Sequence, residues 1–533
     1  MAGQDAFVVA VDVGSASARA GVFDGTGRML ARATASILIN RPQADHAEHS
    51  SADIWSAVAT VTRRALAEAG VTPASVRGLS FDATCSLAVF DAGGKPVTVS
   101  TSGDSSWNVV MWADHRATAE AEEITATGHR VLDYVGGVMS PEMEMPKLMW
   151  LKRHLPSAWQ RYARAFDLAD FLVWRASGRT VASECTVTCK WGYLAHEAEG
   201  WQADFLERIG LDDLPQRGGL VRRASPIGAR AGTLTRQAAD ELGLTTSVEV
   251  GVGLIDAHAG GLALLGGQQV HDLDRHLAVI AGTSTCHMAA SSQPRPIAGV
   301  WGPYFGAMLP GLWLNEGGQS ATGALLDHVL SWLAEGRALG DAGHTRVQAR
   351  IAELGAGPEL DGALLVVPDF HGNRSPLADP HARGVIHGLT LDASFDSLVR
   401  LYHAAAVGVA LGTRHIIDVM NAAGYRIDTL HLTGGHARTP YLVQLTADAT
   451  GCAIVLPQQE DGVLLGTSMV AATAAGLYPS LQDAARTMGG AGRVVRPQSA
   501  ARAAYDRRYR AFRLMLEQRA AVKAILGGAH QAV

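Results

Sequence analysis

Two short breaks between predicted strands constrain this chain more than any other feature of its sequence. The first, Gly14-Ser15-Ala16-Ser17, follows the apolar, β-branched run 7–13, and the second, Gly282-Thr283-Ser284, follows the apolar run 276–281. A tight turn of Gly and hydroxyl residues presents backbone N–H groups and hydroxyls together, a concavity that suits phosphate oxygens. One such turn more often only reverses the chain. Two such turns, each of which opens one large half of the chain, are stronger evidence, because they could close on one polyphosphate from opposite sides.

The surrounding patterns support this division. Residues 19–23 and 29–37 flank the turn 24–27 and predict antiparallel strands, as does 286–290 after the second turn. Helical spacing predicts a helix over 51–69, with Ser51 as N-cap and Gly70 just past its end. Further predicted helices cover 117–127, 397–421, 440–450 and the tail 499–526, and a strand covers 430–432. The boundary is expected within 266–274, which gives domains 1–270 and 271–533.

Composition excludes several classes of protein. With 533 residues, 47% of them hydrophobic and 18% charged, the chain is globular and long enough for more than one domain. A net charge of -6 argues against a nucleic-acid or membrane partner, and no run of about 18 apolar residues predicts a membrane span. Five scattered cysteines favour reduced thiols and a cytoplasmic location.

Two carboxylates are placed for chemistry. Asp12 directly precedes the first turn, and it could hold Mg²⁺ through water or merely accept hydrogen bonds within the turn. Asp256 follows the Gly-rich predicted strand 248–254 and precedes the predicted helix 257–265. Its simplest role is a helix N-cap, and the alternative is a general base that takes a proton from a hydroxyl.

Other polar segments suggest binding sites. Gly434-Gly435 lies between a strand and a helix that begins at Thr439-Pro440, so it is either an ordinary loop or a surface for a flat ring such as adenine. Trp112, Asp114, His115 and Arg116 form one polar–aromatic cluster, and Glu316 and Gln319 follow the expected strand end 313–315. Polyols need convergent donors and acceptors with an aromatic wall, although each residue alone is more often structural. Cys185 and Cys189 lack a second pair of ligands for zinc.

Together these motifs resemble the FGGY family of carbohydrate kinases, within the actin-like ATPase fold. Residues 12–19, Asp-Val-Gly-Ser-Ala-Ser-Ala-Arg, are similar to the first phosphate motif of that family, and 282–284 resemble the second. Residues 432–435 through 447–451 resemble the adenosine motif, and Asp256 matches the catalytic Asp. The resemblance extends over roughly residues 7–478.

The resemblance implies an α/β fold of two actin-like (ribonuclease H-like) domains, with mixed sheets flanked by helices around an interdomain cleft. It implies ATP and Mg²⁺ as cofactors, Asp256 as catalytic base and Asp12 as the water-mediated Mg²⁺ ligand. The implied nucleotide-binding residues are Gly14, Ser15, Ser17, Arg19, Gly282, Thr283, Gly434, Gly435 and Arg438. The implied substrate-binding residues are Thr84, Cys85, Trp112, Asp114, His115, Asp256, Glu316 and Gln319.

Finer matches concern the substrate. Thr84-Cys85-Ser86-Leu87 looks like a signature of D-ribulokinases, which implies transfer to the terminal 5-hydroxyl of a ketopentose, D-ribulose first. Ribitol, L-ribulose or xylulose is the alternative, and a non-catalytic, nucleotide-switched binding protein is a third hypothesis. The sequence departs from the usual motifs at His49, Val407 and Thr439, which stand for Gln, Glu and Asn. The family also favours a homodimer.

Overall fold

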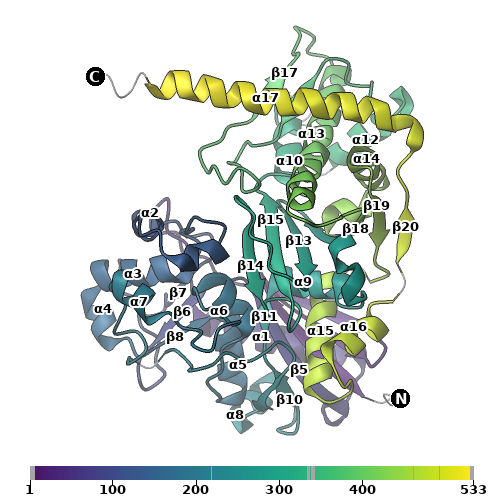
Figure 1. Cartoon of the computed structure of the whole chain (residues 1–533). Helices are drawn as coiled ribbons and strands as arrows, with labels where there is room; N and C mark the ends of the chain where they lie inside the picture. The colour runs from purple at the N-terminus through teal and green to yellow at the C-terminus, as the bar shows by residue number, and fades with distance from the viewer. Residues whose placement is uncertain are drawn as a thin grey trace.

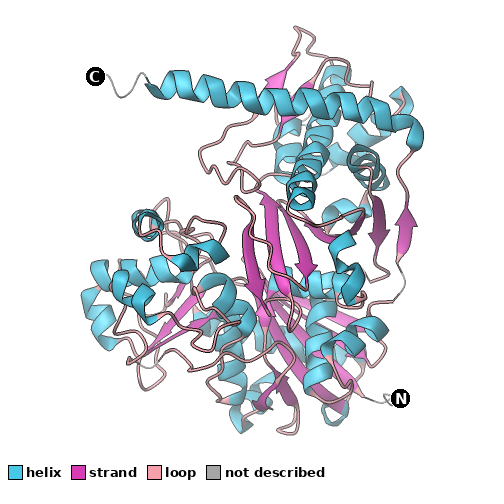
Figure 2. Cartoon of the chain, viewed as in Figure 1, coloured by secondary structure: helices cyan, strands magenta, loops and turns pink. Residues whose placement is uncertain are grey.

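Two mixed β-sheets form the centre of the molecule. The computed structural model describes residues 6–217, 219–332, 337, 342–459, 461–490 and 492–528 (Figure 1, Figure 2). The first sheet has the order β3-β2-β1-β5-β10-β9, with β11 also paired to β5. Its strands are β1 (Phe7–Val13), β2 (Ser17–Asp24), β3 (Met29–Ser36), β5 (Val76–Ala83), β9 (Arg230–Thr233), β10 (Glu249–Gly251) and β11 (Leu254–Ile255).

The second sheet repeats this arrangement, with the order β14-β15-β13-β12-β18-β19-β20. In both sheets two antiparallel pairings are followed by two parallel ones, from β3 to β10 and from β15 to β19. The expected pair of similar mixed α/β domains is therefore confirmed. The strands are β12 (His276–Ala281), β13 (Thr285–Ser291), β14 (Trp301–Phe305), β15 (Trp313–Gln319), β18 (Thr429–Thr433), β19 (Ala453–Leu456) and β20 (Arg493–Val495).

Helices cover the outer faces of both sheets. Alternate residues of β1 point to opposite faces: Val9, Val11 and Val13 pack in one core cluster with α1 (Ser51–Ala69), α5 (Leu168–Ser177) and α8 (Arg236–Leu242). The N-cap of α1 is Ser50 and not Ser51 as expected, because Ser50 has extended backbone and accepts from the Asp53 N–H. Gly70 ends the helix in the left-handed conformation, as expected. In the second half α13 (Phe395–Ala422) and α14 (Pro440–Thr450) share a core with β12 and β18.

Two helices are exchanged between the halves. α15 (Gly462–Ala474) belongs to the second half by sequence but packs on β1 and β5, while α9 (Asp256–Leu265) packs on β12 and β18. The two helices also pack against each other, so they form the layer between the sheets. At their crossing, a Cβ on Gly466 would lie 2.7 Å from the Ala259 carbonyl carbon, and closer still to its oxygen. Only glycine permits this approach.

Smaller elements extend the two halves (Figure 1). The first half carries a four-stranded sheet of β4 (Glu48–His49), β7 (Val109–Val110), β6 (Leu87–Phe90) and β8 (Arg164–Asp167), with α2 (Thr118–Ala126), α3 (Glu144–His154), α4 (Pro156–Arg161), α6 (Glu184–Lys190) and α7 (Ala203–Arg208). The second half carries α10 (Gly323–Leu330), α12 (Gly343–Leu354), β16 (Leu365–Val367), β17 (Val385–His387), α16 (Leu481–Met488) and the long α17 (Arg502–Gly528). Among the described residues no helix is both long and apolar enough to span a membrane. Cys85, Cys185, Cys189, Cys286 and Cys452 are all free thiols.

Candidate active site

The first glycine–hydroxyl turn joins β1 to β2. The Gly14 N–H donates to the Ser17 carbonyl at 3.0 Å, which closes the turn. The Ser15 hydroxyl accepts from the Trp112 indole N–H at 2.8 Å, and its carbonyl contacts His49 Nε2 at 3.0 Å. Burial lowers the pKa of His49 to about 4, so the neutral ring donates this N–H. The amide of a glutamine could donate in the same way, which gives a physical reason why His49 is tolerated here.

Three carboxylates meet at the carboxyl ends of neighbouring parallel strands. Asp12 on β1 is directly paired with Asp82 on β5, and Asp256 immediately follows β11, which pairs with the end of β5. Gly253 allows β11 to approach, since a Cβ there would lie 2.6 Å from the Phe81 carbonyl oxygen. In open α/β sheets this edge is where ligands bind. Asp82 was not singled out from the sequence, although it ends a strand in the same way as Asp12.

Asp12 forms an ion pair with Arg19, its cross-strand partner, with 2.5 Å between Arg19 Nη2 and Asp12 Oδ2. Apart from the Arg19 ion pair and the neighbouring Asp82 carboxyl, the fully buried Asp12 carboxylate has no hydrogen-bond partner among the described residues. Asp82 accepts a hydrogen bond from the Thr467 hydroxyl of α15 through Oδ2, while its Oδ1 is buried without a partner in the described part of the chain. A hydrated cation is the kind of ligand that would satisfy such oxygens.

The electrostatics of these carboxylates reflect burial. Burial raises the pKa of Asp12 to about 7; the Arg19 guanidinium opposes this rise, and the carboxyls of Asp256 and Asp461 add to it. Burial, with the neighbouring Asp12, also raises the pKa of Asp82. Burial raises the pKa of Asp256 as well, against the Ala257 N–H, which donates to Asp256 Oδ1 at 2.7 Å. Asp256 is the first residue of α9, and Ile255 is the N-cap, so the simpler role expected for Asp256 is not the one it has.

The second turn is held by the start of α10. The Gly282 carbonyl accepts from the Gly323 N–H and the Thr322 hydroxyl, both at 3.0 Å, and the Thr283 carbonyl accepts from the Thr322 N–H. Gly434 lies directly beside this turn with φ of 91°, and a Cβ there would lie 2.9 Å from the Ala281 carbonyl carbon. The structure therefore brings the predicted second phosphate turn and the predicted adenosine loop together. Arg438 is exposed at the end of the short helix η5 (Gly435–Arg438).

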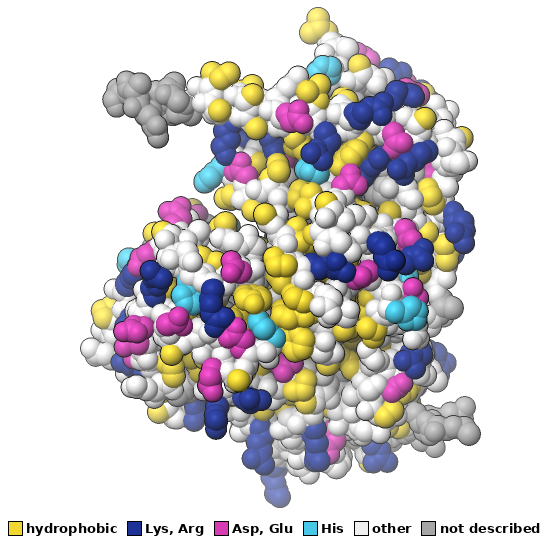
Figure 3. All heavy atoms as spheres, viewed as in Figure 1, with side chains coloured by type: hydrophobic (Ala, Val, Ile, Leu, Met, Phe, Trp, Pro, Cys, Tyr) yellow, Lys and Arg dark blue, Asp and Glu magenta, His cyan; other side chains and the backbone are white. Residues whose placement is uncertain are grey.

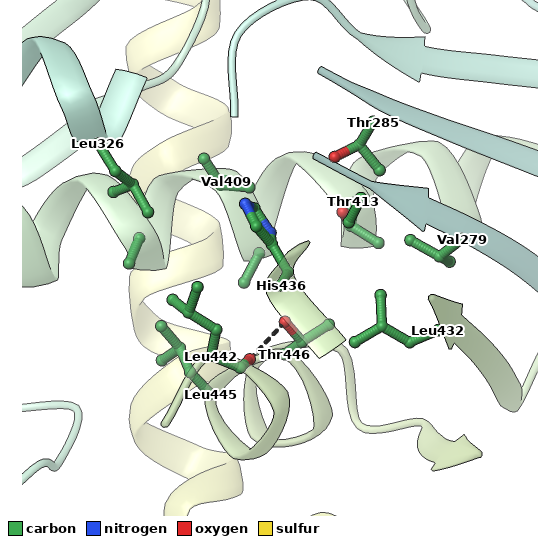
Figure 4. Close-up of a pocket in the computed structure, with 13 residues that line it drawn as sticks. Val279, Thr285, Leu326, Val409, Thr413, Leu432, His436, Leu442, Leu445 and Thr446 are labelled. Carbon is green, nitrogen blue, oxygen red and sulfur yellow. Dashed lines mark hydrogen bonds between the residues drawn. The ribbon is translucent and has the colours of Figure 1, made fainter. Parts of the chain in front are cut away.

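A mostly apolar cavity lies behind this loop (Figure 4). The ring of His436 points into it from η5, toward Val409 of α13 and with Leu442 of α14 on the other side. Burial lowers the pKa of His436 to about 4, so the ring is neutral, and its Nε2 is buried without a hydrogen-bond partner among the described residues. The other lining residues are Val279, Ala281, Thr285, Leu326, Ala406, Ala410, Thr413, Leu432, Leu445 and Thr446.

A second group of charged side chains lies in the region of Asp256 and Cys286. The Lys190 ammonium lies 4.8 Å from the centre of the Trp301 ring, and the Arg374 guanidinium lies 5.5 Å from it. His115 Nε2 lies 3.7 Å from Glu142 Oε1. Burial opposes ionisation of Glu142, but His115, Arg374 and Lys190 lower its pKa to about 2. Cys286 lies four residues past Gly282, and its pKa is affected by the charges of Glu316, Arg374, Asp256 and Lys190. These four side chains therefore lie near the second turn.

Two predicted sugar contacts have other roles in the structure. Asp114 is fully buried, accepts from the Ala47 N–H at 2.6 Å and forms an ion pair with Arg116, which also reaches Glu48. All of these contacts are internal to the protein, and the sugar contact of Asp114 stays a prediction. Gln319 lies within β15, which continues to Gln319 and does not end at Asn315 as expected.

The continuation of β15 separates Glu316 from Gln319, since residues three apart on a strand face opposite sides. Glu316 faces His258 of α9, whereas the Gln319 amide donates to the Val409 carbonyl and to the Thr413 hydroxyl of α13. Gln319 therefore does not line the same pocket as Glu316. Thr84 is buried, and its hydroxyl lies 3.1 Å from that of Ser86, which accepts from the Trp112 backbone N–H. Because the Trp112 indole donates to Ser15, Thr84 is linked to the first turn through Ser86 and Trp112.

Comparison with known proteins decides the family. The model of the FGGY family of carbohydrate kinases, N-terminal domain, matches residues 7–263, and that of the C-terminal domain matches residues 277–475. The chain belongs to the FGGY family. It is accordingly a phosphotransferase with an alcohol group as acceptor, and its substrate is a small-molecule carbohydrate.

Individual relatives match this chain over most of their length. An FGGY carbohydrate kinase domain-containing protein of Danio rerio is 45% identical, over 95% of this chain and 96% of its own. A D-ribulokinase of Saccharomyces cerevisiae is 37% identical, over 88% of this chain and 72% of its own. The crystal structure of a xylulose kinase from Rhodospirillum rubrum has the same fold, with a TM-score of 0.79 at 23% identity, over 98% of this chain and 99% of that one.

Within this FGGY chain, the residues that sequence reasoning missed are Asp82, Glu142, Lys190 and His258. Asp82 carried a usable signal, because an acidic residue at a strand end next to Thr84 follows the logic applied to Asp12. Lys190 and His258 carried none, since a lone lysine or histidine is usually structural. Only the fold brings α6, α9 and β15 together around them. Figure 3 shows the molecular outline indented between the part with α2 and the part with α17.

Proposed function

We propose that the protein transfers the γ-phosphoryl group of ATP to the terminal 5-hydroxyl of a ketopentose, D-ribulose in the first place. The observation that carries this proposal is the position of Asp256, a half-buried carboxylate beside Asp12 at one phosphate turn and near Cys286 at the other. The identity of 37% to a protein named D-ribulokinase favours this sugar. The division into 1–270 and 271–533 assigns one phosphate turn to each domain.

The nucleotide would be held between the two halves. Gly14, Ser15, Ser17 and Arg19 would steady one side of the triphosphate, and Gly282 and Thr283 the other. The closeness of Gly434 to the second turn supports a nucleotide that runs from this turn toward Gly435 and Arg438. The apolar cavity around His436 would then lie beside the base, since a flat ring gains from an apolar wall.

Magnesium fits the residues present. The buried carboxylate of Asp12, with Asp82 beside it, has few donors other than Arg19 and is suited to hold a hydrated divalent cation. When bound, Mg²⁺ neutralises charge on the transferring phosphates. Arg19 keeps the Asp12 carboxylate in place through its ion pair, and Thr467 does the same for Asp82.

Asp256 would accept the proton of the sugar hydroxyl and orient its oxygen. The Ala257 N–H binds Asp256 Oδ1, so Oδ2 is the oxygen that can face the sugar. The sugar itself would lie among Cys85, Trp112, His115, Lys190 and Glu316. Exclusion of water from this pocket matters, because a water in place of the sugar would hydrolyse ATP.

The test is an ATP-consumption assay with D-ribulose, L-ribulose, xylulose and ribitol, compared by kcat/KM. D-ribulose should give the highest value, and Asp256→Asn should reduce kcat by about 10²- to 10⁴-fold while the sugar still binds. A higher value for another of these sugars would assign the alternative substrate. ATP consumption that no sugar or polyol stimulates would refute the kinase and favour a nucleotide-switched binding protein.

A further inference from the structure

Three buried side chains from three separate elements form a continuous chain next to Asp256. Cys185 Sγ on α6 lies 3.0 Å from His258 Nδ1 on α9, and His258 Nε2 lies 3.3 Å from Glu316 Oε2 on β15. Cys185 is fully buried, and His258 is 1% exposed. Neither Cys185 nor His258 has a role in the proposed reaction.

The partners of His258 determine its charge. Nε2 faces the Glu316 carboxylate, and Nδ1 faces the Ala307 carbonyl at 3.2 Å as well as the Cys185 sulfur. Carboxylate and carbonyl oxygens only accept hydrogen bonds, so each ring nitrogen needs a proton. A neutral ring would leave one lone pair facing another inside the core, which is unfavourable. The Ala307 carbonyl thus favours an imidazolium over a neutral ring that accepts the Cys185 S–H; burial would lower the pKa of His258, but Cys185 and Glu316 raise it to about 10.

The sulfur of Cys185 has donors on several sides. The Ile255 N–H donates to it at 3.3 Å, Cys189 hydrogen-bonds to it, and the His258 ring lies opposite. Donors gathered around one sulfur stabilise the thiolate. Against the effect of burial, the Cys189 hydrogen bond and the His258 charge lower the pKa of Cys185 to about 5. An ion pair of thiolate and imidazolium follows, with Glu316 as the second anion.

This chain holds the catalytic segment on both sides. Ile255 directly precedes Asp256, and His258 is two residues beyond it, so Cys185 and His258 anchor the first turn of α9. Glu316 is fixed at the same time by the other nitrogen of His258. This proposal rests on the function proposed above. We propose that Cys185 and His258 are positioning residues: their buried ion pair holds Glu316 in position to bind the sugar and Asp256 in position to bind the sugar's hydroxyl.

A double-mutant cycle tests the link to the sugar. His258→Gln and Glu316→Gln should each reduce kcat/KM for the sugar by about 10- to 100-fold, the value of a hydrogen bond to a charged group, mainly through KM for the sugar. KM for ATP should be unchanged. The double variant should lose little more than Glu316→Gln alone, because His258 acts on the sugar only through its charged contact with Glu316. Additive losses, or an unchanged KM for the sugar, would overturn the positioning role.

Two further variants serve as controls. His129→Gln removes another buried histidine that faces a carboxylate, Asp204 Oδ2 at 3.1 Å, outside this network, and it should leave KM for the sugar unchanged. Cys185→Ser keeps an acceptor of similar size but not the thiolate, so it should give a smaller loss than His258→Gln. If His258→Gln does not unfold cooperatively like the parent protein, the KM for the sugar is compared between Cys185→Ser and the parent instead. A loss in His129→Gln as large as in His258→Gln would overturn the proposal.

The charge of His258 has a readout that needs no substrate. Nitrogen NMR of the histidine rings, assigned by difference with His258→Gln, should show an imidazolium at about pH 8, where an ordinary histidine with a pKa of about 6.5 is neutral. Cys185→Ser should reduce this charge. A neutral His258 in the parent protein would overturn the ion pair. If no sugar stimulates ATP consumption, the proposed function fails, and this measurement still decides the ion pair on its own.

Discussion

The crossing of α9 and α15 offers the sharpest test of how the fold supports the site. In Gly466→Ala the new Cβ would press on the backbone carbonyl of Ala259, which cannot swing aside as a side chain can. Gly260 on the facing helix is the matched control, because the nearest atom to its added Cβ is the Ile280 side chain, Cγ1 at 3.2 Å. Both changes gain the same helix propensity, about 1 kcal/mol, so that gain cancels in the comparison.

Overpacking of a core costs about 1–3 kcal/mol, and contact with backbone belongs at the upper end of this range. We therefore expect Gly466→Ala to be less stable than Gly260→Ala by about 1–3 kcal/mol in urea denaturation. The change should also slow turnover, since Thr467, the next residue, holds Asp82. Thr467→Val, which removes only that hydroxyl, should reduce turnover by about 3- to 10-fold, the value of one ordinary hydrogen bond. If Gly466→Ala is as stable as Gly260→Ala, the helices do not cross as described.

Three further predictions concern charge at the site. Asp12→Asn should raise the Mg²⁺ concentration needed for half-maximal turnover by about 10- to 100-fold, as expected for a ligand that acts through water, and an unchanged Mg²⁺ titration would contradict this. Burial raises the pKa of Asp256, and a general base must be ionised to act. As the pH is lowered, kcat/KM should therefore begin to fall at a pH above about 3.9, the pKa of free aspartate. A profile that stays flat down to pH of about 3.9 would contradict Asp256 as the base. Lys190→Met should raise KM for the sugar, because it removes one of the cations near Glu142 and Glu316 and leaves Arg374 as the other; equal KM values would remove Lys190 from the sugar site.

Periodicity and turn chemistry were sufficient to predict much of the fold. The strand over 7–13 and the helix over 440–450 have the predicted bounds, and both glycine–hydroxyl turns connect strands as expected. These features are local, because apolar alternation and Gly or Pro placement act within a few residues. The strand expected over 248–254 is instead divided into β10 and β11, which both pair with β5, and Gly253 between them lies too close to the Phe81 carbonyl oxygen for a Cβ.

The site was predicted less completely, for a physical reason. Asp12 and Asp256 stand next to a turn and a helix start, which the sequence displays, whereas the partners of Asp114 and Gln319 come from distant segments. A side chain already satisfied by such partners looks the same in the sequence as one that awaits a ligand. The homodimer and the cytoplasmic location stay predictions.

The two hairpins that open the halves are both antiparallel but carry unequal charge. The pair Asp12 and Arg19 occupies the second rung from the turn in the first hairpin, and Ile280 and Cys286 occupy that rung in the second. On the neighbouring parallel strand, Asp82 corresponds in the same way to Thr433. Two hairpins with the same strand pairing would not by themselves favour one direction of a bound phosphate chain over the other. Ionic side chains lie in the first hairpin alone, so the two turns differ in charge. Under the proposed function, this difference would give the cation and the leaving group a single orientation relative to the acceptor.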